Sequence, residues 1–232
     1  PMALTTADVL ERIDAIHKER SNYGHPLWSG MVDGTHNLEQ VRYFCKQHSI
    51  ITLHNHNYHG RLYVSCPDPL WRERIAEVSY EEATGRLFAN GVSHHKLYLN
   101  YAKGLGLSKN EMYSVDYCGG SLAFKAYFSD ACSRFVEGVS AHMLAGEAQI
   151  PGLYARIADR LKEKFGLEGV ALDYWYVHDK ADEDHSDAGR ELLDQFAETD
   201  ADRELVLHTV RKTVDVMFVM YDDIWAHMQT LQ

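Results

Sequence analysis

The sequence predicts an all-α protein, a bundle of seven or eight helices in one domain over residues 1–232. Apolar residues recur at helical intervals in nearly every segment, for example at Val206, Val210 and Val214 near the C-terminus. No segment shows the alternation of apolar and polar residues that is typical of a β-strand. Glycine and proline separate the periodic segments, as at Gly24 and Pro26. A helical bundle is the architecture that buries such apolar stripes.

Each expected helix has a local signal for where it begins or ends. Thr5 precedes the first helix, Asn37 can cap the second, and Ser108 with Glu111 forms a capping box. Gly166 closes a short amphipathic helix, because glycine accepts the left-handed backbone of a helix end. In chain order we expect a first helix after Thr5, then helices over 38–65, 71–88 and 94–104. A further helix begins at 108, and four more follow over 121–148, 153–165, 171–196 and 202–229.

Composition and charge limit the function. The 232 residues are enough for one buried core, and 45% of them are apolar. A formal net charge of -11 argues against a nucleic acid or an anionic membrane as the main partner. We expect neither a signal peptide nor a membrane span, and therefore a cytoplasmic protein, which we further expect to be a homodimer. The four cysteines are widely spaced and are expected to be free thiols: Cys45, Cys66, Cys118 and Cys132.

A row of three potential metal ligands lies near the C-terminus. His178, Asp182 and His185 are spaced at i, i+4 and i+7, so a helix would place them on one face. Two imidazoles and a carboxylate suit iron, manganese or zinc. The alternative is a solvated acidic face, because Asp179 and Glu183 lie in the same segment.

Two further carboxylates extend apolar stripes. Glu82 follows Ile75 and Val78 on one helical face, whereas Glu81 shares the opposite face with charged residues and is expected to face solvent. Glu147 likewise ends a largely apolar stripe. A buried carboxylate is costly unless a cation compensates its charge.

The next helix starts with His94, which shares a face with Leu97 and Tyr101. Four helices therefore each offer inward-pointing donors, and a bundle of this kind can hold two metal ions between bridging carboxylates.

Two motifs at this point resemble those of a known family. GVSAHMLAGEAQIP contains Glu147 before a Q-x-P turn, and HDKADEDH repeats the H-x-x-x-D-x-x-H pattern of His178, Asp182 and His185. From about residue 38 to the last helix, the sequence resembles the heme-oxygenase-like diiron oxidases and oxygenases within the TENA/PqqC-like group. By motif it is most similar to the CADD-like members.

The family's earlier helix carries an acidic pair, a glycine and then a histidine before a run ending in L-G. Glu81, Glu82, Gly85 and His94 match that pattern. The resemblance implies a heme-oxygenase-like fold, O2 as co-substrate and two Fe(II) ions per chain, with Glu147 bridging them at the catalytic centre. The implied metal ligands are Glu82, His94, Glu147, His178, Asp182 and His185.

The sequence also departs from the family pattern. The segment between Gly85 and His94 is long, which leaves open whether Glu81 or Glu82 is the ligand. Gly146 stands where CADD has tyrosine. Ile157 stands where CADD has a lysine, ten residues past Glu147, so the aminobenzoate chemistry of that protein is not expected here.

The resemblance implies oxidation of a small amino-acid-like substrate in natural-product biosynthesis, by C–C or C–N cleavage, desaturation or N-oxygenation. Candidate substrate contacts are His56, Tyr101 and His142, since polar side chains on presumed inner faces suit a polar ligand.

Three alternatives remain open. One is a fatty-acid oxidative decarboxylase of the same family. A second is a metal-free TENA/PqqC-like enzyme, for which Cys118 and Cys132 lie near the region of a nucleophile. The third is a non-catalytic helical interaction protein.

Overall fold

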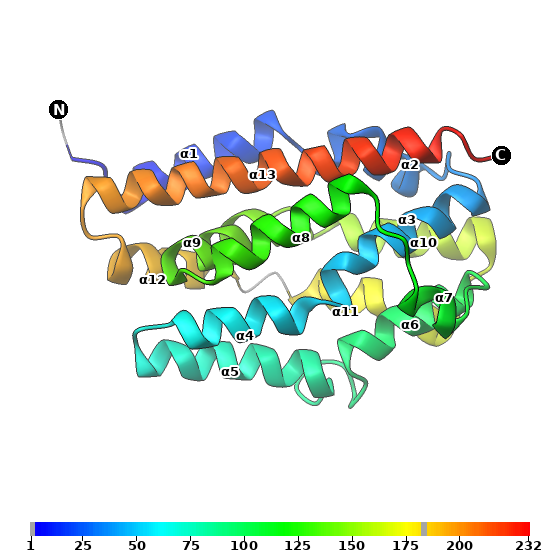
Figure 1. Ribbon diagram of the computed structural model, residues 1–232, viewed down its shortest axis with the longest axis horizontal. Helices are drawn as coiled ribbons and strands as arrows, with labels where there is room; N and C mark the ends of the chain where they lie inside the picture. Colours follow the sequence, from blue (N-terminus) through cyan, green and yellow to red (C-terminus); the bar gives the residue numbers. More distant parts are fainter. Residues whose placement is uncertain (1–2, 182–184) are drawn as a thin grey trace.

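The computed structural model describes residues 3–181 and 185–232, with the side chains of all of these except 181 and 185–188. Figure 1 shows α1 (Thr6–Glu19) and α13 (Asp200–Met228) side by side along one edge of an elongated bundle, and α4 (Asn55–Ser65) with α5 (Pro69–Thr84) along the opposite edge. The described part of the chain contains helices and no strand, which confirms the all-α prediction.

Capping residues fix several helix starts, as the sequence predicts. Capping boxes open α1, α3 and α7 at the predicted residues Thr5, Asn37 and Ser108, and a further box, not predicted, opens α13 at Thr199. Glycine in the left-handed conformation ends α2 and α5, at Gly34 and Gly85. The remaining helices between these are η1 (Asn22–Gly24), α2 (Pro26–Asp33), α3 (Leu38–Thr52), α6 (His94–Gly104), α7 (Lys109–Tyr113) and α10 (Leu153–Phe165).

Three of the long helices predicted from periodicity are divided in the structure. Residues 38–65 form α3 and α4, separated at Leu53 and His54. Residues 121–148 form α8 (Gly119–Cys132), α9 (Phe135–Val139) and the π-helical turn η2 (Ser140–Gly146). Residues 171–196 form the end of η3 (Gly169–Ala171), then α11 (Asp173–Ala181) and α12 (His185–Phe196). Periodicity identifies the buried face of a segment, but it does not show where the backbone changes direction.

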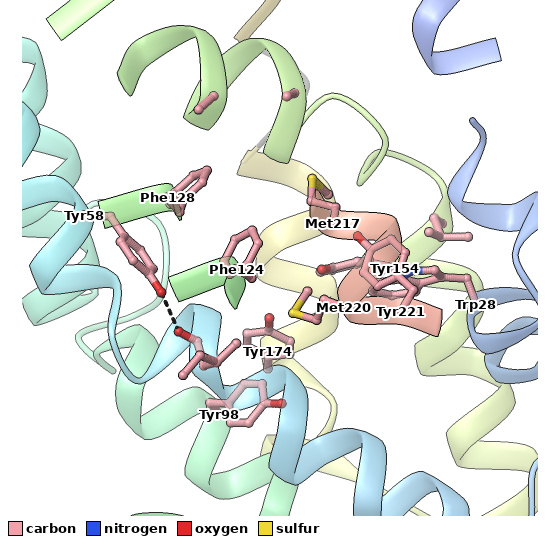
Figure 2. Close-up of a cluster of buried hydrophobic side chains, with 14 of the residues drawn as sticks. Trp28, Tyr58, Tyr98, Phe124, Phe128, Tyr154, Tyr174, Met217, Met220 and Tyr221 are labelled. Atoms are coloured by element: carbon pink, nitrogen blue, oxygen red, sulfur yellow. Dashed lines mark hydrogen bonds between the residues drawn. The ribbon is translucent and has the colours of Figure 1, made fainter. Parts of the chain in front are cut away.

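A cluster of buried aromatic side chains occupies the middle of the bundle (Figure 2). Tyr58 donates its hydroxyl hydrogen to the carbonyl of Ile50 at 2.8 Å, and its ring contacts Phe128 edge to face. Trp28 packs against Tyr154 and Tyr221 at the other end of the cluster. These large rings come from helices far apart in the sequence, so they join the layers of the bundle.

None of the described helices, α13 included, combines the length and apolar character that crossing a bilayer requires.

Gly85 sets the path of the segment between α5 and α6. It has a φ of 64°, and a Cβ there would collide with the backbone of Val92. We expect Gly85→Ala to lower the free energy of unfolding by about 2–4 kcal/mol, the sum of backbone strain and overpacking. Chemical denaturation measures this loss.

Gly91→Ala is the matched control for Gly85→Ala. Gly91 has a φ of 77° in the same segment, but no heavy atom lies within 4 Å of its Cβ position. It should lose only about 1 kcal/mol, the strain of the left-handed backbone. Equal losses in the two variants would show that the contact with Val92 does not matter.

Candidate metal centre

Three potential metal ligands from three helices meet inside the bundle. Glu82 comes from α5, His94 from the first turn of α6, and His178 from α11, and their ligand atoms all lie within 4.8 Å of one another. His94 Nδ1 is 3.0 Å from Glu82 Oε1 and 3.1 Å from His178 Nε2. The structure thus brings together one member of the predicted C-terminal row and the donors from the two earlier helices.

A backbone contact orients the ring of His178. Its Nδ1 lies 2.7 Å from the carbonyl oxygen of Tyr174, one helical turn earlier, and can only donate to it. The proton of the neutral ring is therefore on Nδ1, and Nε2 presents a lone pair to His94 and Glu82. The ring also packs against that of Tyr174, with centroids 4.4 Å apart. Such contacts hold the ring of a metal-binding histidine and fix its tautomer.

Glu81 orients His94 from the other side. Its Oε1 lies 3.2 Å from His94 Nε2 and can accept a hydrogen bond from it, which would hold the ring in place while Nδ1 binds a metal instead of a proton. The second oxygen of Glu81 accepts hydrogen bonds from the backbone N–H groups of Leu87 and Phe88 at 2.6 and 3.1 Å. Glu81 is only 5% exposed, so the prediction that it faces solvent is wrong. The segment after α5 folds back and covers it, which helical periodicity does not reveal.

The cluster consequently presents three electron-pair donors to one point, namely Glu82 Oε1, His94 Nδ1 and His178 Nε2. Groups arranged this way repel one another unless a cation lies between them. Burial by itself lowers the pKa of His94, but the neighbouring carboxylates of Glu82 and Glu81 outweigh burial and raise it. A proton on His94 can therefore serve as that cation. A divalent metal can replace the proton, and two histidines with one carboxylate form the donor set of non-haem Fe(II) oxygenases. The residues fit the metal.

The other charges of the cluster suit the same role. Burial, followed by the influence of His94, lowers the pKa of His178 to about 4, so its ring is neutral at pH 7 as a metal ligand must be. Burial raises the pKa of Glu82, but His94 more than offsets this and the pKa is lowered to about 2. Asn55 donates a hydrogen bond to the second oxygen of Glu82. Glu82 is therefore ionised and held in place.

Glu147 lies next to this cluster and contacts a second pair of histidines. Its Oε1 is 3.2 Å from His142 Nδ1, and His142 Nε2 is 2.8 Å from His59 Nε2. The charge of Glu147 acts on the rings of both His59 and His178, favouring their protonated forms. Glu147 is thus close enough to both groups of histidines to influence their charge.

Of the remaining predicted site residues with described side chains, His142 lies at this site, whereas His56 and Tyr101 do not. The side chains of Asp182 and His185 lie outside the described residues. His56 is exposed on the surface of α4 and lines a shallow depression with His54. Tyr101 is completely buried against Tyr98 and Trp175, away from the cavity described next. His142 does line that cavity.

His59 and Asn55 are not among the site residues that the sequence predicts. Both line the cavity, because the division between α3 and α4 changes which face of the second segment points inward. The spacing of His56 and His59, at i and i+3, indicates that they lie near one face of a helix. Which of the two points into the cavity depends on the break at Leu53 and His54, because the break sets the rotation of α4 about its axis.

A cavity of about 360 Å³ opens beside the cluster. Most of its wall is aromatic or aliphatic, and the cluster of Glu82, His94 and His178 is part of its polar lining. Arg74, at the start of the cavity wall formed by α5, is the single lysine or arginine among the described lining residues. Apolar and aromatic lining residues are Trp28, Ile51, Tyr58, Trp71, Ile75, Val78, Leu87, Phe88, Phe124, Phe128, Met143, Ile150, Tyr154, Tyr174, Met217 and Tyr221.

The cysteines do not belong to this site. No cysteine is among the described residues that line the cavity. Cys132 is completely buried, and burial raises the pKa of its thiol to about 12. Burial also raises the pKa of the Cys118 thiol. Nucleophilic cysteines have lowered pKa values, so neither thiol has the properties of a catalytic group.

Comparisons with known proteins find relatives that match nearly the whole chain. A 4-aminobenzoate synthase of Nitrosomonas europaea is 24% identical over 233 residues, covering 95% of this chain and 92% of the relative. A CADD-like protein of unknown function from Nostoc punctiforme has a similar structure, with a TM-score of 0.75, 14% identity and coverage of 96% of this chain and 98% of that one.

A domain of unknown function from Shewanella denitrificans, described as having a heme-oxygenase-like fold, gives a TM-score of 0.74 at 16% identity, covering 97% of this chain and 92% of that one. The iron-containing redox enzyme family matches residues 42–217, which is most of the chain. The chain therefore belongs to the family of iron-containing redox enzymes and has the heme-oxygenase-like fold.

Proposed function

We propose that this protein is a non-haem diiron oxidase or oxygenase that uses O2 to oxidise a small molecule bound in the cavity. The observation that carries the proposal is the convergence of Glu82 Oε1, His94 Nδ1 and His178 Nε2 on one point of the cavity wall. Three electron-pair donors at one point suit a metal ion. Their opening into a mostly apolar cavity suits a substrate bound beside that ion.

In this proposal Glu82, His94 and His178 hold one iron ion. Glu147 would be the catalytic carboxylate that the two ions share, and Asp182 and His185 would be the remaining ligands of the second ion. Bound iron supplies the electrons that O2 needs for the reaction. Glu81 keeps the Nδ1 lone pair of His94 available, and the aromatic wall limits the access of water to the reacting groups.

The lining of the cavity supports a substrate with a largely apolar or aromatic body and a polar group directed at the cluster. Asn55 and Thr52 add hydrogen-bonding groups to the wall near Glu82 and Tyr174. An amino acid or amino-acid derivative with an apolar side chain meets both requirements. A fatty acid is the second candidate, because its chain would also match the apolar lining. We place the reaction in natural-product biosynthesis, by analogy with the family.

The relative from Nitrosomonas europaea is a 4-aminobenzoate synthase, which supports an oxidative enzyme of this family. The position ten residues after Glu147, where the CADD-like pattern has a lysine, is Ile157, and it is completely buried. An aliphatic side chain cannot replace the chemistry of an amine. We therefore propose a different reaction for this chain.

The proposed metal centre predicts specific binding of iron. Anaerobic titration with Fe(II), followed by Mössbauer spectroscopy, should show about two ions per chain. His178→Ala should weaken the binding of at least one ion by more than about 100-fold, because it removes a ligand. His227→Ala, which removes an exposed histidine of α13 beside Asp223, is the control and should bind iron as the wild type does. Identical binding by the His178 and His227 variants would contradict the proposal.

The neighbouring glutamates should respond differently to substitution. Glu82→Ala removes a proposed ligand and should abolish binding at this position. Glu81→Gln keeps a side chain of the same shape but weakens the hydrogen bond that orients His94, so iron should still bind, about 10-fold more weakly. Calorimetric titration distinguishes these results. The reverse order of effects would make Glu81 the ligand.

Consumption of O2 should depend on iron and not on a thiol. With amino acids and fatty acids tested in turn, an oxygen electrode should record substrate-dependent consumption that a chelator abolishes and that Cys118→Ala leaves unchanged. Activity that survives chelation and is lost with Cys118 would instead support a metal-free enzyme.

A further inference from the structure

The π-helical turn η2 ends at Glu147 on the cavity wall. The backbone N–H of Glu147 donates to the carbonyl of His142, five residues earlier, at 3.2 Å. In an α-helix, at about 100° per residue, side chains five apart would point about 140° away from each other. The wider turn instead leaves the side chains of His142 and Glu147 in contact. Inserted π-helical turns are frequent at functional sites.

The contact defines how the ring of His142 is protonated. Its Nδ1 lies 3.2 Å from Glu147 Oε1, and a lone pair at Nδ1 would face the negative oxygen. The neutral ring therefore carries its proton on Nδ1 and a lone pair on Nε2. Since His142 Nε2 is 2.8 Å from His59 Nε2, the proton of that contact comes from His59. The order is His59 donating to His142, and His142 Nδ1 lying at ion-pair distance from Glu147, without the alignment of a hydrogen bond.

Burial holds this pair in place. His59 is 4% exposed, and the ring of His142 packs against Phe128 with centroids 5.7 Å apart. Burial and the neighbouring His142 lower the pKa of His59 to about 4, so its ring is neutral near pH 7. Neither ring is among the six ligands that the resemblance implies, so the pair needs another explanation.

We propose that His142, supported by His59, is a positioning residue that fixes the direction of the Glu147 carboxylate beside the cluster of Glu82, His94 and His178. The inference rests on the proposed function, in which Glu147 binds metal. The π-helical turn brings His142 to the carboxylate, and the buried His59 prevents the His142 ring from turning away. A carboxylate that is already oriented before the metal binds holds the metal more tightly than a carboxylate that becomes ordered only on binding.

The test compares two substitutions of His142 by anaerobic Fe(II) titration of the full chain. His142→Phe keeps a ring that can pack against Phe128 but removes the N–H, and it should weaken iron binding by about 10- to 100-fold. His142→Asn places an amide N–H near the original Nδ1 position and should recover most of the affinity. Wild-type affinity in His142→Phe, or no recovery in His142→Asn, would overturn the inference.

His59 has a matched control on the same helix. His59→Phe should cause a smaller loss of affinity than His142→Phe, because the contact between His142 and Glu147 survives without its support. His56→Phe changes an exposed histidine of α4 and should bind iron like the wild type. Equal affinities for the His59 and His56 variants would remove His59 from the proposal.

A metal-free measurement separates this inference from the proposed function. In protein labelled with ¹⁵N-histidine, NMR should show the proton of His142 on Nδ1, and Glu147→Gln should shift that signal. A proton on Nε2 of His142 would overturn the inference whether or not iron binds. Absence of iron binding by the wild type would instead overturn the proposed function.

Discussion

The buried contact between Glu81 and His94 is the interaction on which the rest of the site depends. It holds the ring of His94 through Nε2, so that Nδ1 faces Glu82 and His178. The same carboxylate binds the backbone of Leu87 and Phe88, which closes the segment after α5 over the site. A carboxylate this deeply buried is tolerated because its hydrogen bonds compensate the loss of water. One side chain therefore orients a proposed ligand and shapes the cavity wall.

Breaks in the helices give the cavity its polar residues. The division between α3 and α4 turns His59 and Asn55 inward, and the π-helical turn after α9 sets His142 against Glu147. A continuous helix would direct some of these side chains elsewhere, because its side chains advance by about 100° per residue. The aromatic cluster around them joins the layers of the bundle and keeps the changed backbone in place. The irregular segments thus position the groups that carry chemistry.

Low polarity around the histidines decides their charge. His59 and His178 are neutral near pH 7 because burial opposes protonation more than the nearby carboxylates favour it. His94 is the exception, since two carboxylates contact it directly. A centre of neutral imidazoles and ionised carboxylates has the charge distribution that a divalent metal compensates.

The sequence by itself determined the all-α architecture. Helical periodicity and the cap at Thr5 are local properties, so they predict α1, and periodicity predicts α13. Charged residues that continue apolar stripes, as Glu82 does, are also recognisable locally, but the family motifs leave Glu81 and Glu82 as alternatives. This information identifies which faces are buried.

Only the tertiary structure decided which donors meet and how they are oriented. The choice between Glu81 and Glu82 depends on the segment that folds back over α5, and the tautomers of His94 and His178 depend on Glu81 and on the carbonyl of Tyr174. His59 enters the site and His56 does not, because the break before α4 sets the phase of that helix. These outcomes depend on contacts between distant segments, which the spacing of residues along one segment cannot express.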